Sequence, residues 1–478
     1  MRLLLRHLSL LSNKLGQRGR NLGWNLAGQL LPMLTGIVFV PLLLHALGTP
    51  RFGFLSLIWV MIGYFSLFDL GLARALTQRV AELGASRSSP SKSDASANII
   101  DPRLRTTVAT GMLLITALAL ISMPMLLAGK GPILDNFIHV GGPLADEAAR
   151  AFIWLVLGVP VVILAAGVRG LLEGEHRFAE VNAVRTPAGM AMFIAPWLAT
   201  LIAPTLAAVT FAVFAVRLLQ LAGFTWLARG MLLASLRRAA IDRAEVRMLF
   251  SFGLWITVSN IVGPVLVYID RFVLSHYGSL SAVAYYSTPF DLLARLLFVG
   301  AAVQGVMFPA VSAALATSPA DVGRLLRQNY ALLLLMFVPV LLLTAVFARW
   351  GLTLWLGADF AAHSAGVLRI LTLGIFLNVL TGVPFGLLQS MRRADLTAKV
   401  HLVELPLYLV LLIVLVRDFG ITGAAWGWVA RVAFDFTALS WLAHRERRRA
   451  VPARSPVLAL VHSHSAATPA SRSPAARA

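Results

Sequence analysis

Long apolar stretches recur along nearly the whole chain and are separated by short polar segments. A run of about 20 mostly apolar residues is long enough to cross a bilayer as a helix. The pattern predicts twelve such helices, with approximate bounds 23–46, 53–76, 105–128, 151–172, 186–203, 206–228, 248–270, 283–312, 329–348, 365–390, 399–416 and 421–443. We therefore predict an all-α integral membrane protein with about 12 transmembrane helices.

The overall composition supports this class. Of the 478 residues, 58% are hydrophobic and only 13% are charged, whereas soluble domains carry roughly 25% charged residues. The chain contains no cysteine, which excludes disulfides and thiolate metal sites. No G-x-x-x-x-G-K-[ST] motif occurs, so we expect no nucleotide site. We expect no cofactor and no metal.

The basic residues are distributed very unevenly between the two sides of the predicted helices. If both termini are cytoplasmic, the segments on the cytoplasmic side hold 31 Lys and Arg and the opposite loops hold six. Cytoplasmic loops of membrane proteins are enriched in Lys and Arg. The net charge of +20 is therefore explained by topology, and we predict cytoplasmic termini and no nucleic-acid partner.

An internal repeat predicts two pseudo-symmetric six-helix halves. The segment GLLEGEHRFAEVNAVR (170–185) resembles GLLQSMRRADLTAKVH (386–401), an offset of 216 residues. The predicted domains are a basic cytoplasmic N-terminal arm, two helical halves and a disordered basic cytoplasmic tail: 1–21, 22–246, 247–443 and 444–478. Because both halves start on the same side, the repeat is parallel, and such folds place a cavity between the halves.

Four arginines interrupt the apolar helices, and an ionisable residue within a membrane span is a candidate functional residue. Arg217 and Arg431 lie near the middle of their helices and are 214 residues apart, which matches the repeat. Arg295 lies well inside the span 283–312. Arg369 lies closer to a helix end, from which its long side chain can reach the membrane interface.

Five acidic residues are candidates for ion coupling or gating: Asp69, Asp270, Asp291, Glu404 and Asp435. Asp291 lies one turn before Arg295, and Asp435 lies one turn after Arg431, so two local ion pairs are an alternative to a functional role. Glu404 has no such partner on its own helix, and its neighbour in sequence is His401 in HLVELPLYL.

Asp69 stands in FSLFDLGLARALTQR (65–79), near the cytoplasmic end of the predicted helix 53–76. One interpretation is that this carboxylate helps to end the helix within reach of water. The other is that it belongs to an inner gate and pairs with a basic residue when the cytoplasmic mouth closes. Arg169, Arg177, Arg392 and Arg393 are predicted on the same side.

Several of these segments resemble the polysaccharide transport family of the MOP exporter superfamily, the Wzx-type flippases of bacteria. The resemblance lies in FDLGLARAL, YIDRFVLSHYG, GLLQSMRRADLTAK and DFGITGAAWGW, and it covers roughly residues 20–443. It implies a multi-pass protein of the bacterial inner (cytoplasmic) membrane. The implied function is to flip an undecaprenyl-pyrophosphate-linked oligosaccharide between leaflets, by alternating access of two helix bundles, for O antigen of lipopolysaccharide, capsule or exopolysaccharide. Membrane lipids and the polysaccharide polymerase machinery are the implied partners.

The chemistry of such a substrate requires cations, because guanidinium groups bind phosphate in a bidentate manner. We therefore expect Arg217, Arg295 and Arg431, with Arg369 as a fourth candidate, to bind the pyrophosphate in the cavity. Transport could be coupled to a proton or sodium gradient through the acidic residues named above.

Two other classes of protein are alternatives to this one. A MATE-type, cation-coupled small-molecule exporter shares the architecture but needs a predominantly acidic cavity for cationic drugs, and the four arginines argue against it. A polymerase or ligase needs catalytic residues on a large outer loop. The longest outer loop, 129–150, is short, and no H-E-x-x-H or G-x-S-x-G motif occurs. We therefore predict a transporter and not an enzyme.

Overall fold

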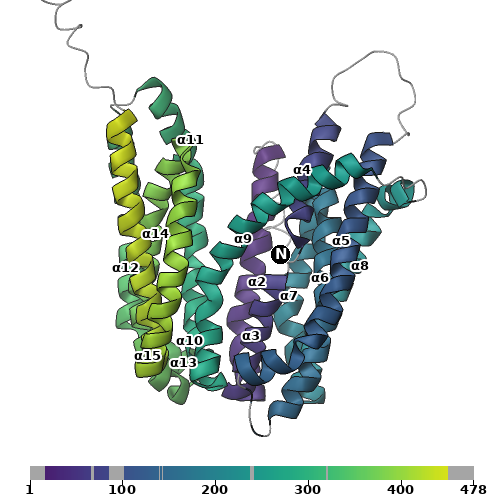
Figure 1. Cartoon of the computed structure of the whole chain (residues 1–478). Helices are drawn as coiled ribbons and strands as arrows, with labels where there is room; N and C mark the ends of the chain where they lie inside the picture. Colours follow the sequence, from purple (N-terminus) through teal and green to yellow (C-terminus); the bar gives the residue numbers. More distant parts are fainter. Residues whose placement is uncertain are drawn as a thin grey trace, which may run out of the picture.

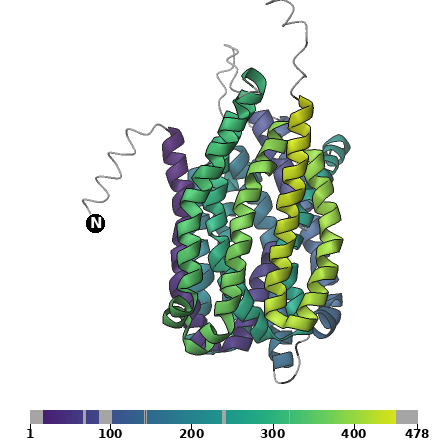
Figure 2. The same cartoon turned by 90° about the vertical axis from the view of Figure 1, so that its left-hand side faces the viewer.

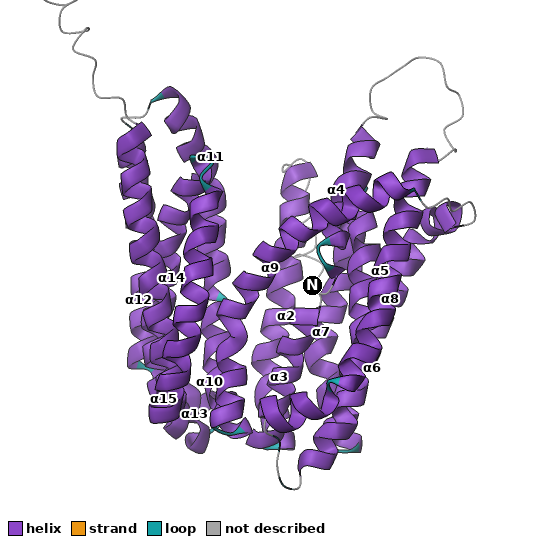
Figure 3. Cartoon of the chain, in the orientation of Figure 1, coloured by secondary structure: helices purple, strands orange, loops and turns teal. Residues whose placement is uncertain are grey.

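The protein is described here from a computed structural model, which describes residues 17–65, 69–85, 102–138, 140, 142, 144–236, 242–318 and 321–450. All regular structure in these ranges is helical (Figure 3). The elements are α2 (Gln17–Leu47), α3 (Thr49–Phe65), α4 (Leu72–Ala85), α5 (Pro102–Ala128), a short π-helical segment η2 (Pro132–Phe137), α6 (Leu144–Gly174), α7 (Phe178–Ile202), α8 (Leu206–Leu236), α9 (Arg243–Tyr277), α10 (Leu280–Ala294), α11 (Leu296–Thr317), α12 (Val322–Val346), α13 (Ala348–Leu356), α14 (Ala358–Ser390) and α15 (Ala394–Ala450).

The prediction of an all-α membrane protein is confirmed. Within the described residues, eight helical segments are long and apolar enough to cross a membrane: Leu30–Leu47, Pro102–Ala128, Leu144–Gly174, Leu206–Ser235, Leu280–Thr317, Val322–Val346, Ala358–Ser390 and Ala394–Arg449. Each of the twelve predicted spans overlaps a helix of the structure. Most of the N-terminal arm lies outside the described residues, as do residues 86–101 after α4 and the tail beyond Ala450. Up to that residue, α15 is helical, past residue 444, where the sequence predicted the tail to start.

Two predicted spans contain breaks, and two others are joined. The span 53–76 is divided between α3 and α4, where Leu70 and Gly71 have positive φ angles of 50° and 70°. The span 283–312 is divided at Arg295, between α10 and α11. The spans 399–416 and 421–443 are two arms of α15, joined at Gly420, whose φ is 55° and ψ −129°.

The helices form two groups (Figure 1). The first group contains α2 to α8 and the second contains α10 to α15. They meet at one end of the molecule, here the joined end, and spread apart at the other, the diverging end, which carries the last turns of α4 and α15. Seen after a 90° turn, helices of the second group stand side by side (Figure 2).

Helix α9 runs between the groups. It packs against α10 and α15 of the second group and also against α3, α4 and α5 of the first. The boundary that the repeat predicts between residues 246 and 247 falls in the first turns of this helix. Since α9 contacts both groups, the division into halves at that position stays a prediction.

Close backbone contacts hold the joined end together. A Cβ atom added to Gly53 in α3 would lie 1.8 Å from the carbonyl oxygen of Leu280 in α10, so only glycine permits this approach. Trp355 in α13 donates its indole N–H to the carbonyl oxygen of Ile37 in α2 at 2.7 Å. The two groups are therefore in direct contact at this end through main-chain atoms.

Single glycines make several of the connections at the joined end. Gly48 alone links α2 to α3, and Gly357 alone links α13 to α14. Their φ angles are 73° and 93°, which side chains with a Cβ rarely adopt. Together with Gly420, which joins the arms of α15, they allow the chain to reverse direction almost without a loop.

Glu147 connects three helices near the same end. Its buried carboxylate in α6 accepts hydrogen bonds from Arg51 Nε in α3 at 2.9 and 3.1 Å, and from the backbone N–H of Leu206, the first residue of α8, at 2.6 Å. This one side chain therefore neutralises a cation and satisfies a donor that has no partner within its own helix.

We expect Glu147→Ala to lower the free energy of unfolding by about 2 to 4 kcal/mol, because a buried N–H and a guanidinium lose their acceptor. The measurement is thermal unfolding of the purified protein in detergent. Asp146→Ala is the matched control, since Asp146 is exposed and adjacent in sequence. Equal unfolding temperatures for the two variants would contradict the role assigned to Glu147.

Candidate functional site

A cavity lies between the two groups of helices. Its volume is about 310 Å³, and it is lined from α2, α3, α7 and α8 on one side and from α10 and α13 on the other. Three of its lining residues are ionisable: Arg217, Asp291 and Arg295. Two of the arginines predicted to bind the substrate therefore share one cavity, together with one of the predicted acids.

Neither cavity arginine forms an ion pair within the described part of the chain. Arg217 in α8 donates from Nη1 to Gln220 Oε1, one turn later, at 3.0 Å, and its Nε has no hydrogen-bond partner there. Arg295 stands where α10 passes into α11 and lies against Gly36 in α2. A Cβ at Gly36 would be 3.2 Å from Arg295 Nη2. Both guanidinium groups thus keep hydrogen-bonding capacity for an anion in the cavity.

Asp291 is paired with a residue that the sequence placed in a loop. Arg271, expected just beyond the span 248–270, lies inside α9 with its side chain only 2% exposed. Its Nη2 is 2.5 Å from Asp291 Oδ1, so Asp291 pairs across two helices and not with Arg295 on its own segment. The helical continuation through RFVLSHY was the signal in the sequence that could have placed Arg271 within the helix.

Asp270 precedes Arg271 and is completely buried. Its Oδ1 accepts a hydrogen bond from the backbone N–H of Arg271 at 2.8 Å, and its Oδ2 accepts one from the hydroxyl of Tyr286 in α10. Among the residues that the structure describes, Asp270 does not line the cavity. It instead connects α9 to α10 through the hydrogen bond from Tyr286.

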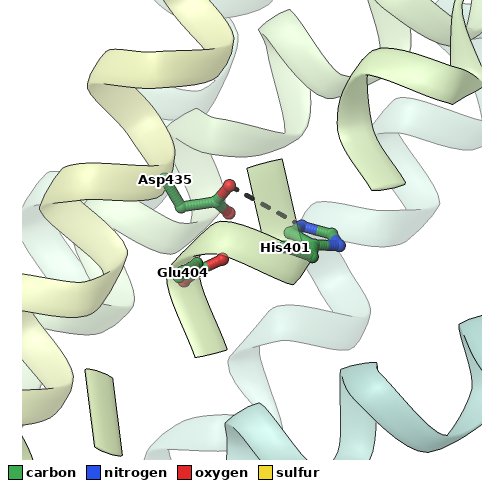
Figure 4. A group of neighbouring side chains, drawn as sticks. All are labelled: His401, Glu404 and Asp435. Atoms are coloured by element: carbon green, nitrogen blue, oxygen red, sulfur yellow. Dashed lines mark ion pairs between the residues drawn. The ribbon is translucent and has the colours of Figure 1, made fainter. Parts of the chain in front are cut away.

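Arg431 lies outside the cavity in this structure. It is 8% exposed, its Nε is 3.0 Å from Glu404 Oε1, and its Nη1 donates to the carbonyl oxygen of Leu266 at 2.9 Å. Asp435, which the spacing along the helix made its expected partner, is instead 3.6 Å from Nε2 of His401 (Figure 4). The pairs thus form between the two arms of α15 and not along one arm.

Arg369 and Asp69 also lie apart from the cavity. Arg369 is exposed, and its Nε donates to the carbonyl oxygen of Ala345 at 3.1 Å. It lies three turns inside α14, which begins at Ala358 and so extends beyond the predicted start of the span at 365. Asp69 is buried and accepts hydrogen bonds from the backbone N–H groups of Gly71 and Ala73 at 2.9 and 3.3 Å. It therefore caps the beginning of α4, whereas the sequence suggested a residue that ends a helix.

The basic residues proposed as gate partners of Asp69 mostly have other partners here. Arg169 pairs with Glu173 at 3.5 Å, and Arg177 pairs with Glu180 at 2.5 Å. Arg393 pairs with Asp395 at 3.0 Å and contacts Glu446. The gating interpretation of Asp69 stays a prediction about another conformation.

A second cavity, of about 610 Å³, lies between α11 and α14 of the second group. Its lining is mainly apolar and includes Phe308 and Phe385, with the amides of Gln304, Asn378 and Gln389. Gln304 Oε1 accepts a hydrogen bond from Asn329 at 3.0 Å, while Gln304 Nε2 has no partner in the described chain. Apolar walls with a few polar groups are typical of ligand sites.

Comparisons with known proteins agree on one class of protein. The family described as "Polysaccharide biosynthesis protein" matches residues 19–315. A Shigella flexneri protein named "Putative O-antigen transporter" is 28% identical over 426 residues, which is 88% of this chain and 97% of that relative.

Solved structures of two transporters share the fold. The inward-facing conformation of a multidrug resistance MATE family transporter of the MOP superfamily has a TM-score of 0.71 at 13% identity, over 89% of this chain and 96% of that one. The lipid II flippase MurJ, in an inward closed conformation, has a TM-score of 0.62 at 10% identity, over 94% of each chain. This protein therefore belongs to the polysaccharide biosynthesis protein family and is a multi-pass membrane protein with the fold of MOP superfamily transporters.

Proposed function

We propose that this protein flips an undecaprenyl-pyrophosphate-linked oligosaccharide from the cytoplasmic to the periplasmic leaflet of the bacterial inner membrane. The observation that carries the proposal is the cavity between the two groups, where Arg217 and Arg295 lie together without an ion-pair partner in the described chain. The S. flexneri relative, whose name is that of an O-antigen transporter, supports the substrate class.

The cavity suits an anion better than a cation. Its ionisable lining residues are two arginines and one aspartate, and that aspartate is engaged by Arg271. A lipid pyrophosphate that leaves the headgroup region must exchange water for other hydrogen-bond donors, and guanidinium groups supply several in a fixed planar geometry. The same cavity would disfavour the cationic compounds that a drug exporter takes, which argues against the exporter alternative.

The second cavity supports the oligosaccharide part of the proposal. Sugars present hydroxyls that both donate and accept hydrogen bonds, and amide side chains provide both functions. Gln304, Asn378 and Gln389 line the cavity beside two phenylalanines. In our proposal the pyrophosphate occupies the cavity of Arg217 and Arg295, and sugars of the glycan contact the amides of the second group.

The arrangement of the helices suggests how movement would occur. The groups are in contact at the joined end and spread at the diverging end (Figure 1), and the likeness to an inward-facing transporter supports a cytoplasmic position for the diverging end. The excess of Lys and Arg in the segments assigned to that side favours the same orientation. Alternating access then requires the Gly53 contact to open while the diverging ends approach each other.

The proposal is tested in a strain from which the gene has been deleted. We expect undecaprenyl-pyrophosphate-linked oligosaccharide to accumulate in the cytoplasmic leaflet and surface polysaccharide to disappear, with both restored by the intact gene. Mass spectrometry of extracted lipids identifies the accumulated species. Unchanged surface polysaccharide together with new sensitivity to cationic dyes would contradict the proposal and establish the exporter alternative.

A further inference from the structure

Four ionisable side chains meet inside the second group, between the two arms of α15. His401 and Glu404 come from the first arm, before Gly420, and Arg431 and Asp435 come from the second. Figure 4 shows Asp435 reaching across toward the arm that carries His401 and Glu404. The ligand atoms of His401, Glu404 and Asp435 all lie within 4.8 Å of one another.

The formal charges of this cluster do not balance. Two carboxylates and one guanidinium leave a charge of −1 when the imidazole is neutral, and an uncompensated charge in a buried place is strongly unfavourable. One added positive charge makes the cluster neutral, whereas a divalent cation would leave an excess of +1. The formal charge of the cluster therefore becomes zero when it binds one monovalent cation.

Unsatisfied atoms within the cluster point to the same missing partner. The Glu404 side chain is 2% exposed, and its Oε2 has no hydrogen-bond partner in the described chain. Asp435 Oδ1 also lacks a hydrogen bond, since His401 lies beyond hydrogen-bond distance at 3.6 Å. Buried carboxylate oxygens are normally satisfied, and a proton on Glu404 would supply a missing donor.

The surroundings favour a proton over a sodium ion. Hard cations prefer several oxygen ligands, but the guanidinium of Arg431 lies against Glu404 and already uses the nearby carbonyl oxygen of Leu266. Two further titratable groups face Arg431. Tyr408, on the first arm of α15, has its ring centre 5.9 Å from the guanidinium carbon of Arg431, and Asp270 lies on α9. Asp270 is itself hydrogen-bonded by Tyr286 of α10.

The exposed fractions of the side chains suggest a route for the proton. His401 is 28% exposed, Asp435 is 9% exposed and Glu404 is 2% exposed. His401 also lies two turns from the start of α15, toward the diverging end. A proton can therefore reach the imidazole from that end and pass inward to the carboxylates.

We infer that the cluster of His401, Glu404, Arg431 and Asp435 binds one proton and communicates its occupancy to α9 through Arg431. When Glu404 is neutralised, Arg431 loses its ion pair and keeps the hydrogen bond to Leu266 of α9. Since α9 contacts both groups of helices, a change in how Arg431 holds it biases their relative position. The inference rests on the proposed transport function and names the driving ion and its site.

The test uses the purified full chain in liposomes with a fluorescent derivative of the lipid-linked oligosaccharide from the deletion strain. The steady-state ratio of substrate between the leaflets is measured under a pH gradient and, separately, under a sodium gradient at uniform pH. One proton per transported molecule shifts this ratio about tenfold for each pH unit. We expect that shift for the unaltered protein and no shift from sodium.

Glu404→Gln is expected to leave the ratio near one under any pH gradient, with slower equilibration, and His401→Gln to weaken the response. Glu404→Gln leaves the Arg431 guanidinium without its ion-pair partner. The double variant Glu404→Gln, Arg431→Gln removes this unpaired charge and is measured in parallel. His444→Gln and Asp418→Asn are matched controls, since both residues are exposed on α15 outside the cluster, and both variants should keep the tenfold shift.

The outcomes separate the two proposals. A pH response that survives in both Glu404 variants overturns the assignment of the site, and a sodium-driven shift that these variants abolish overturns the choice of ion. Equilibration by the unaltered protein that ignores both gradients overturns the inference but leaves the transport function intact. Only the absence of any substrate movement in the unaltered protein contradicts the transport function itself.

Discussion

Replacement of both Arg217 and Arg295 by glutamine is expected to abolish export of the surface polysaccharide while the chain still inserts in the membrane. A charge-assisted hydrogen bond contributes about 1.5 to 3 kcal/mol, so each single substitution should reduce transport roughly 10- to 150-fold. Lysine at either position should restore part of the activity, because it keeps the charge but not the bidentate geometry. The measurements are the amount of surface polysaccharide and the amount of accumulated lipid-linked intermediate.

Arg229→Gln is the control for these variants. Arg229 lies on α8 with Arg217 but is exposed and stacks on Trp226, outside the cavity. Transport should be unaffected by its replacement. Normal export by the doubly substituted protein would show that the cavity arginines do not bind the transported lipid.

Gly53→Ala is expected to disrupt the joined end, because the new methyl group would overlap the carbonyl oxygen of Leu280 at 1.8 Å. The overlap is with main chain and cannot be relieved by a rotamer change, so we expect a cost of at least about 1 to 3 kcal/mol to the closed contact. Transport should fall sharply, and the ends of the two groups should separate.

The absence of native cysteine makes this separation directly measurable. Spin labels at Ile202→Cys in α7 and Leu354→Cys in α13, both exposed positions, report the distance between the groups. The mean distance should increase in the Gly53→Ala background. Gly63→Ala is the control in the same helix, where an added Cβ meets no atom within 4 Å, and an unchanged distance in Gly53→Ala would refute the contact.

The helices could be predicted from the sequence because their apolar stretches are long, but the breaks within them could not be located by hydropathy. FSLFDLGL remains apolar across the break between α3 and α4. The positive φ of Leu70 and Gly71 and the capping by Asp69 depend on local hydrogen bonds. The available signal was the sequence Asp-Leu-Gly, which precedes a segment with a different pattern of polar and apolar residues. Asp favours the start of a helix, so this sequence could have indicated that a second helix begins here.

The sequence shows that arginines interrupt the apolar stretches, but the partners of these arginines could not be predicted from it. Spacing along one helix suggested Asp291 with Arg295 and Arg431 with Asp435. In the structure, Asp291 pairs with Arg271 of α9, and Arg431 pairs with Glu404 of the opposite arm of α15. Such pairs depend on which helices pack together, and a single sequence carries little information about that packing. For the same reason, the burial of Arg271 was not predicted. It is buried because α9 extends seven residues beyond the predicted end of its span.

The single-glycine connections also affect the step after transport. Where Gly48, Gly357 and Gly420 reverse the chain, the protein has almost no surface beyond the helix ends. In the proposed orientation, that end faces the periplasm. At these three connections a delivered glycan would meet no protruding loop, so the enzyme that next extends or attaches it would collect the lipid-linked sugar there at the level of the bilayer itself. Handover would then be governed by lateral encounter in the membrane, and the concentration of that enzyme in the membrane would set the pace of assembly.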